Sequence, residues 1–107
     1  MTNFISTGST YWISDEEIQI LEKKATNGDK NSAFKLYQYY MFVSLDQDSE
    51  FKWLEIAAKN GHPIAQSNLA DLFFTQGNKE KAIFWAKKAY RNSAKLPDEL
   101  KILININ

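Results

Sequence analysis

An internal repeat constrains the fold of this chain more than any other feature of its sequence. The segment NGDKNSAFKLYQYY at 27–40 aligns with NGHPIAQSNLADLF at 60–73, a shift of 33 positions. The alignment matches glycine, leucine and aromatic positions, namely Gly28 with Gly61, Leu36 with Leu69 and Tyr40 with Phe73. Trp53 and Trp85 are 32 positions apart, so the second unit should have a loop one residue shorter; residues 20–28 add a half copy upstream. Repeats of this length are typical of chains that stack small helical units.

Apolar residues recur at helical spacing within each unit, and no segment alternates strictly between apolar and polar residues as a half-buried strand would. Ser14 followed by Glu17 is a capping-box pattern, which marks a helix start. Gly28 and Gly61 stand where a left-handed residue can close a helix, and Pro63 suits a first helical turn. We therefore predict an all-α fold with helices near 15–27, 30–43, 48–59, 63–75, 79–92 and 97–104.

The repeat resembles the Sel1-like repeat, a relative of the tetratricopeptide repeat. Positions that match this family's pattern are Gly28, Leu36, Tyr40, Trp53, Leu54, Ala57, Ala58, Gly61, Ala65, Leu69, Phe73, Lys81, Ala82, Trp85 and Ala89. Departures from it are Tyr37 and Ala70 in place of glycine, Ser49 and Glu50 in place of Lys-Ala, and Asn92 near the closing glycine. The resemblance implies antiparallel helix pairs stacked into a solenoid, with about two repeats and flanking helices.

At 107 residues the chain is long enough for one domain and too short for two. We expect a single Sel1-like repeat domain over 1–107, with an N-terminal arm at 1–13, helical repeats at 15–92 and a C-terminal capping helix at 93–107. The first residues include no basic side chain and no continuous apolar run, and no stretch reaches the roughly 18 apolar residues of a membrane span. The cytoplasm is therefore the expected compartment.

Few residues of the sequence suit catalysis or metal binding. His62 is the only histidine, cysteine is absent, and the glycines are isolated. We expect His62 to serve the corner before Pro63 as a structural or capping residue. Asp46, Asp48 and Glu50 resemble the start of a calcium loop, but Phe51 and Ala57 stand where that loop needs glycine and glutamate. No enzymatic activity, small-molecule substrate, cofactor or metal is expected.

The resemblance implies a scaffold for protein contacts, because the repeat itself carries no chemistry. Short members of the family are similar to small bacterial immunity or adaptor proteins that occlude a cognate toxin, and this is the function we predict. A nucleic-acid-binding module is one alternative, because bases such as Lys87, Lys88 and Arg91 lie beside aromatic residues in 79–95. Against it, Trp85 and Phe84 are explained as core residues. A homodimer or homo-oligomeric scaffold is another alternative.

The segment 33–43 has more aromatic residues than one buried stripe needs. At helical spacing, Ala33, Leu36, Tyr40 and Val43 form the stripe that faces the partner helix, with Tyr37 and Tyr39 flanking it. The remaining positions and their counterparts one period on are the predicted partner-binding residues: Phe34, Lys35, Gln38, Met41, Phe42, Asn68, Asp71, Phe74 and Thr75. In the competing interpretation, the arm at 1–13 covers this surface with Phe4, Ile5, Tyr11 and Trp12.

Overall fold

A computed structural model of the chain describes residues 10–105, and every regular element in that range is an α-helix. The helices are α2 (Asp15–Thr26), α3 (Lys30–Phe42), α4 (Gln47–Lys59), α5 (Pro63–Thr75), α6 (Lys79–Arg91) and α7 (Asp98–Leu103). The all-α prediction is confirmed, and no predicted helix boundary is wrong by more than one residue. Helices α3 and α5 begin 33 positions apart, whereas α4 and α6 begin 32 apart, as the two repeat spacings predicted.

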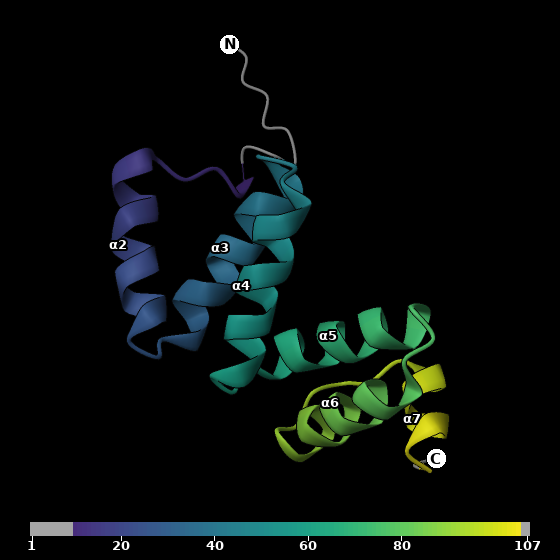
Figure 1. Ribbon diagram of the computed structural model, residues 1–107. Helices are drawn as coiled ribbons and strands as arrows, with labels where there is room; N and C mark the ends of the chain where they lie inside the picture. Colours follow the sequence, from purple (N-terminus) through teal and green to yellow (C-terminus); the bar gives the residue numbers. More distant parts are fainter. Residues whose placement is uncertain (1–9, 106–107) are drawn as a thin grey trace.

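The helices pack mainly on their neighbours in the sequence. The most extensive contacts join α3 to α4 and α5 to α6; α2 packs on α3, α4 packs on α5, and the short α7 packs on α6. Figure 1 shows the two pairs, with α3 and α4 running along the height of the view and α5 and α6 running across it. The molecule is elongated, measuring 49 × 33 × 23 Å. Because the shape is elongated, both the α3–α4 pair and the α5–α6 pair leave part of their surface exposed to solvent.

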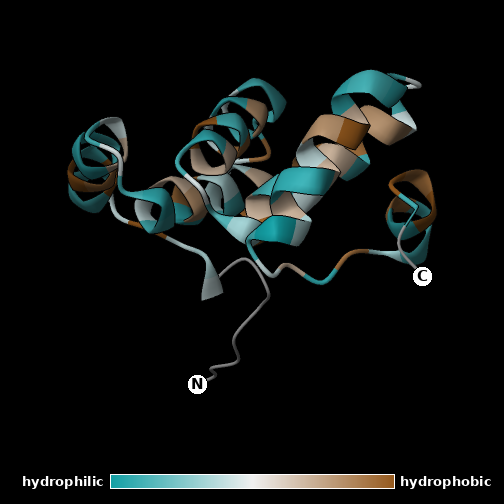
Figure 2. Cartoon of the chain, turned by 90° about the horizontal axis from the view of Figure 1, so that it is seen from below, coloured by the Kyte–Doolittle hydropathy of each residue, from teal (hydrophilic) through white to brown (hydrophobic). Residues whose placement is uncertain are grey.

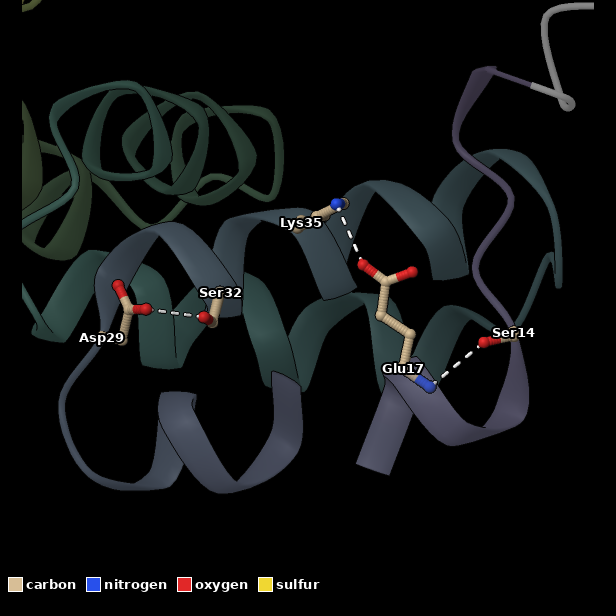
Figure 3. A network of polar contacts seen from close by, with 5 residues as sticks. All are labelled: Ser14, Glu17, Asp29, Ser32 and Lys35. Carbon is tan, nitrogen blue, oxygen red and sulfur yellow. Dashed lines mark hydrogen bonds and ion pairs between the residues drawn. The ribbon is translucent and has the colours of Figure 1, made fainter. Parts of the chain in front are cut away.

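Side chains just before the helices satisfy the free amides of the first turns. The Ser14 hydroxyl accepts from the Glu17 amide (3.2 Å), which confirms the predicted start of α2. Asp29 accepts from the Asn31 amide (3.2 Å) and from the Ser32 hydroxyl (2.7 Å), and Figure 3 shows the Ser14 and Ser32 contacts together. The hydrogen bond from Ser32 is the main cause that lowers the pKa of Asp29.

Left-handed residues close the helices at the corners between pairs. Gly28 has a φ of 102° after α2 and Gly61 a φ of 98° after α4, so both glycine predictions are confirmed. After α6 the corresponding position is Ser93, with a φ of 69°. Within the pairs, Leu45 (φ 56°) and Gly77 (φ 82°) turn the chain from α3 into α4 and from α5 into α6. Two of these five positions therefore hold a left-handed conformation without glycine.

Small residues and two tryptophans form the core. Alanines with no exposed surface, such as Ala57 and Ala89, let paired helices approach closely, and Leu36 and Leu69 fill the space between them. In Figure 2 the hydrophobic residues occupy part of each helix and the hydrophilic residues the rest. Trp53 and Trp85 are 4% and 9% exposed, which confirms both as core residues rather than ligand platforms.

The predicted stripe of α3 packs against the core at three of its positions, namely Ala33, Leu36 and Tyr40, and not at Val43. Ala33 and Leu36 are buried, whereas Tyr40 and Val43 are only half-buried. Tyr37, which was expected beside the stripe, is only 6% exposed, and its ring lies 5.3 Å from the ring of Phe34. The side-chain amide of Asn68 on α5 donates to the Tyr37 hydroxyl (3.4 Å), and burial raises the pKa of Tyr37.

Candidate functional site

The nine predicted partner-binding residues lie on two helices that belong to different pairs. We call this surface the α3–α5 face. It comprises Phe34, Lys35, Gln38, Met41 and Phe42 on α3 with Asn68, Asp71, Phe74 and Thr75 on α5. The fold brings part of this set to the surface and uses the rest to join the two pairs.

The exposed part of the face is mostly polar. Lys35, Asp71 and Thr75 are exposed, Gln38 is half-buried, and Phe42 keeps 39% of its surface accessible. The Lys35 ammonium lies 3.3 Å from the Glu17 carboxylate of α2, as Figure 3 shows, and both side chains are about half exposed. An ion pair this exposed is weak and easily exchanged for one with a partner. On α3, Lys35 and Gln38 therefore offer polar contacts on the side of the helix that carries the ring of Phe42.

The half-buried part of the face connects α3 to α5. The ring of Phe34 stacks on His62 at the start of α5, with ring centroids 4.0 Å apart, and lies 5.3 Å from the ring of Tyr37. Met41 and Phe74 are half-buried and pack against the core. The apolar patch expected from these residues with Phe42 is consequently smaller than the sequence suggested, because three of its four members are used within the molecule.

One residue of the N-terminal arm reaches the α3–α5 face. Tyr11 stacks on Phe42 with ring centroids 4.5 Å apart, so the arm covers part of this ring. Trp12 remains 64% exposed, whereas Ile13 is buried. Phe4 and Ile5, which the covering interpretation also invoked, lie outside the described residues. Within residues 10–105 the arm thus covers the Phe42 end of the face.

His62 is a capping residue, as its position before Pro63 predicted. Its ring nitrogen Nδ1 accepts from the Ala65 amide (3.2 Å), so the ring caps α5 while it stacks on Phe34. Burial, with a smaller effect from the nearby Lys30 ammonium, lowers the pKa of His62. The neutral ring is therefore held in place, and its acceptor nitrogen is already occupied.

The acidic loop before α4 has a structural role as well. Asp46 accepts from the Ser49 amide (3.3 Å) and from the Ser49 hydroxyl (2.9 Å), and the hydroxyl bond is the main cause that lowers the pKa of Asp46. Across residues 10–105, no three acidic, histidine or cysteine side chains are grouped so that they can hold a metal ion.

The basic residues of α6 lie on its outer side. Lys81 lies over the ring of Phe73 (5.3 Å), and Lys88 lies over the rings of Phe84 (5.3 Å) and Trp85 (5.9 Å). Trp85 is core, as predicted, but Phe84 is 52% exposed, so the expectation that it belongs to the core is wrong. Its position on α6 is opposite the helix face that packs on α5.

A hollow between α4 and α5 was not predicted from the sequence. It encloses about 310 Å³ and is lined by Gln47, Glu50, Phe51, Leu54, Leu72 and Gln76. The sequence signal that points to it is Phe51, an aromatic residue that is 36% exposed on an otherwise polar first turn. Only the angle between the two helix pairs decides whether a hollow opens there.

Comparison with known proteins finds one similar protein and assigns the chain to no family. The uncharacterized protein YibG of Escherichia coli strain K12 is 35% identical over 94 residues, which covers 81% of this chain and 61% of YibG. The chain thus spans less than two thirds of that protein's length. No family model matches the sequence, and no solved structure matches it. No helix within residues 10–105 is both long and apolar enough to cross a membrane.

Proposed function

We propose that this protein is a non-enzymatic protein-interaction module, built as a short Sel1-like solenoid, that binds a protein partner through its α3–α5 face. The most concrete version, by the family resemblance, is a small bacterial immunity or adaptor protein that occludes a cognate toxin. The observation that carries the proposal is the mixed surface of α3, where the exposed Lys35 and the half-buried Gln38 lie on the same side of the helix as the partly exposed ring of Phe42. Rings surrounded by polar groups suit protein interfaces.

Equivalent contacts at successive corners support the solenoid. The side-chain amide of Asn60, which caps α4, donates to the Ala25 carbonyl of α2 (3.4 Å). One corner later, the amide of Asn92, which caps α6, donates to Gln66 (2.9 Å), and Gln66 donates to the Ala58 carbonyl of α4 (3.0 Å). Helix α4 is thus tied directly to α2, and α6 is tied to α4 through Gln66 of α5, as expected of stacked units.

The state of His62 supports a role without catalysis. Catalysis by a general base needs an accessible acceptor atom within reach of a substrate. The Nδ1 atom of His62 is taken by the Ala65 amide, and one face of the ring is covered by Phe34. His62, the histidine that could best act as a general base near neutral pH, is therefore already used to cap α5.

The proposal is tested with three single substitutions on the exposed part of the face: Gln38→Ala, Phe42→Ala and Asp71→Ala. A tagged chain is first used to isolate its partner from native cells, and dissociation constants are then measured by calorimetry. If the face is the interface, at least two of these changes should weaken binding by about tenfold, which corresponds to roughly 1–2 kcal/mol each. A growth assay with the co-expressed partner then tests whether binding neutralises it.

Matched controls lie on α7, away from the face. Ile102→Ala and Glu99→Ala also remove exposed apolar and acidic side chains and should leave affinity unchanged. Circular dichroism should give the same helix content for all five variants. If the three face variants bind as tightly as the control variants, the α3–α5 face is not the interface. Substrate turnover that depended on His62 or Asp71 would contradict the non-enzymatic proposal.

A further inference from the structure

Helices α4 and α5 meet at the corner around Gly61 and diverge away from it (Figure 1). The hollow of about 310 Å³ lies where they are apart, between the first half of α4 and the last half of α5. Phe51, Leu54 and Leu72 supply its apolar lining, and Gln47, Glu50 and Gln76 supply its polar lining. Its volume is about that of the smallest ligand pockets, large enough for one big side chain.

The rim of the hollow is acidic. Glu50 is the charged residue of its lining, and Asp46 and Asp48 precede Glu50 in the sequence at the start of α4. None of these three carboxylates forms an ion pair with another described residue. The nearest base in sequence, Lys52, places its ammonium over the ring of Trp53 at 4.8 Å. A molecule that binds in the hollow should therefore present an apolar side chain to its apolar lining and a positive charge to Glu50.

Helix α6 of the same protein carries that combination. Phe84 is 52% exposed, and the Lys88 ammonium lies 5.3 Å from its ring centroid. Around them the helix has five basic residues and a single acidic one. Within residues 10–105, none of the five bases forms an ion pair with a carboxylate. The buried side of α6 is formed by Ala82, Trp85, Ala86 and Ala89, so Phe84 lies on the opposite side of the helix with half of its surface exposed.

We propose that copies of this protein associate head to tail, with Phe84 of one copy seated in the hollow of the next. The bases beside Phe84, among them Lys88, then face Glu50 at the rim of the hollow. Charge complementarity along the chain favours a second copy as the occupant: residues 1–56 contain nine acidic and five basic residues, and residues 57–107 contain four and eight.

The two surfaces are different, so the contact is not self-complementary. Each added copy leaves one free hollow and one free Phe84, and assembly continues unless the rotation closes a ring. The lining of the hollow shares no residue with the α3–α5 face, and the two proposals are tested with different variants, so a failure of one is distinguishable from a failure of the other.

Analytical ultracentrifugation of the full chain tests the proposal. At about 50 mM salt the average mass should rise with protein concentration, and at about 500 mM salt the association constant should fall at least tenfold because exposed charges are screened. Two variants then block one surface each: Phe84→Asp removes the inserted side chain, and Glu50→Lys reverses the charge of the carboxylate that lines the hollow. Each variant alone should remain a monomer, and an equimolar mixture of the two should give a heterodimer that grows no further.

Matched controls use the same helices. Tyr90→Asp changes an exposed ring on another side of α6, and Glu55→Lys reverses an acidic residue elsewhere on α4; both should associate like the unmodified chain. Circular dichroism checks that every variant is folded. The proposal is overturned by a chain that stays monomeric at all concentrations, by blocked variants that still associate, or by a mixture that gives no heterodimer.

The same α6 surface provides the competing outcome. A fluorescently labelled single strand of about 20 nucleotides is added at low salt, where binding to phosphates is strongest. A monomeric chain that binds this strand, and loses binding in the Phe84→Asp variant, would assign the surface to nucleic acid and overturn self-association.

Discussion

Replacing Asn92 by alanine should destabilise the protein even though Asn92 is exposed, because its partner is buried. The Asn92 amide donates to the side-chain oxygen of Gln66 (2.9 Å), and Gln66 is only 3% exposed. Gln66 uses its own amide to donate to the Ala58 carbonyl (3.0 Å). Removing Asn92 therefore leaves a buried oxygen without its partner among residues 10–105.

The expected cost follows from that geometry. Leaving one buried polar atom unsatisfied costs about 1–3 kcal/mol, whereas an exposed polar side chain changed to alanine usually has an effect within about 0.5 kcal/mol. Asn92→Ala should therefore lower the free energy of unfolding by about 2 kcal/mol. Gln66→Ala should cost a similar amount, because it removes both hydrogen bonds. The double variant should fall short of the sum of the two by about 1 kcal/mol or more, because the changes remove one shared contact.

The assay is urea unfolding followed by circular dichroism, with thermal unfolding as a second measurement. Asn27 provides a matched control: it caps α2 at the position equivalent to Asn92, is exposed, and its cap contacts come from the backbone amide. Asn27→Ala should change the free energy of unfolding by about 0.5 kcal/mol or less. Equal effects of Asn92→Ala and Asn27→Ala, or additive effects of Asn92→Ala and Gln66→Ala, would refute the reasoning.

Two other predictions concern the corners and the caps. Gly77→Ala should destabilise by about 1 kcal/mol although an added methyl group meets no atom within 4 Å, because a φ of 82° strains any residue with a side chain. Urea unfolding measures this, and an unchanged midpoint would show that the turn relaxes freely. Because the pKa of His62 is lowered from its ordinary 6.5, stability should be full above that pH and decline as the pH falls through 6.5 toward the folded-state pKa. His62→Ser keeps a capping oxygen without the charge, so its stability should vary less than that of the unmodified chain between about pH 8 and pH 5, and equal slopes would contradict this.

The sequence predicted which side of its helix each residue of the candidate site lies on, but it did not predict which of these residues are exposed. Helical spacing placed Lys35 and Asp71 correctly on the outer sides of their helices, because the sides of a helix follow from its period alone. It could not separate Phe42, which stays partly exposed, from Phe34, which stacks on His62. The difference depends on where the second helix pair crosses the first, and no local pattern specifies that.

The sequence by itself determined the helices, their ends and the spacing between pairs. Caps such as Asp29, the first-turn Pro63 and the corner glycines Gly28 and Gly61 act within a few residues, so their signals are complete in the local sequence. The repeated tryptophans likewise marked the core, because equivalent positions in a repeat meet equivalent surroundings.

Only the tertiary structure decided how the two pairs meet. The hydrogen bond from Asn68 on α5 to Tyr37, the link from Asn92 through Gln66 to Ala58, and the hollow beside Phe51 each join residues far apart in the sequence. Their contacts depend on the angle and separation of the pairs, which result from the packing of all the side chains between them. A periodic pattern fixes which side of a helix is apolar, but the fit between two such sides requires three-dimensional packing.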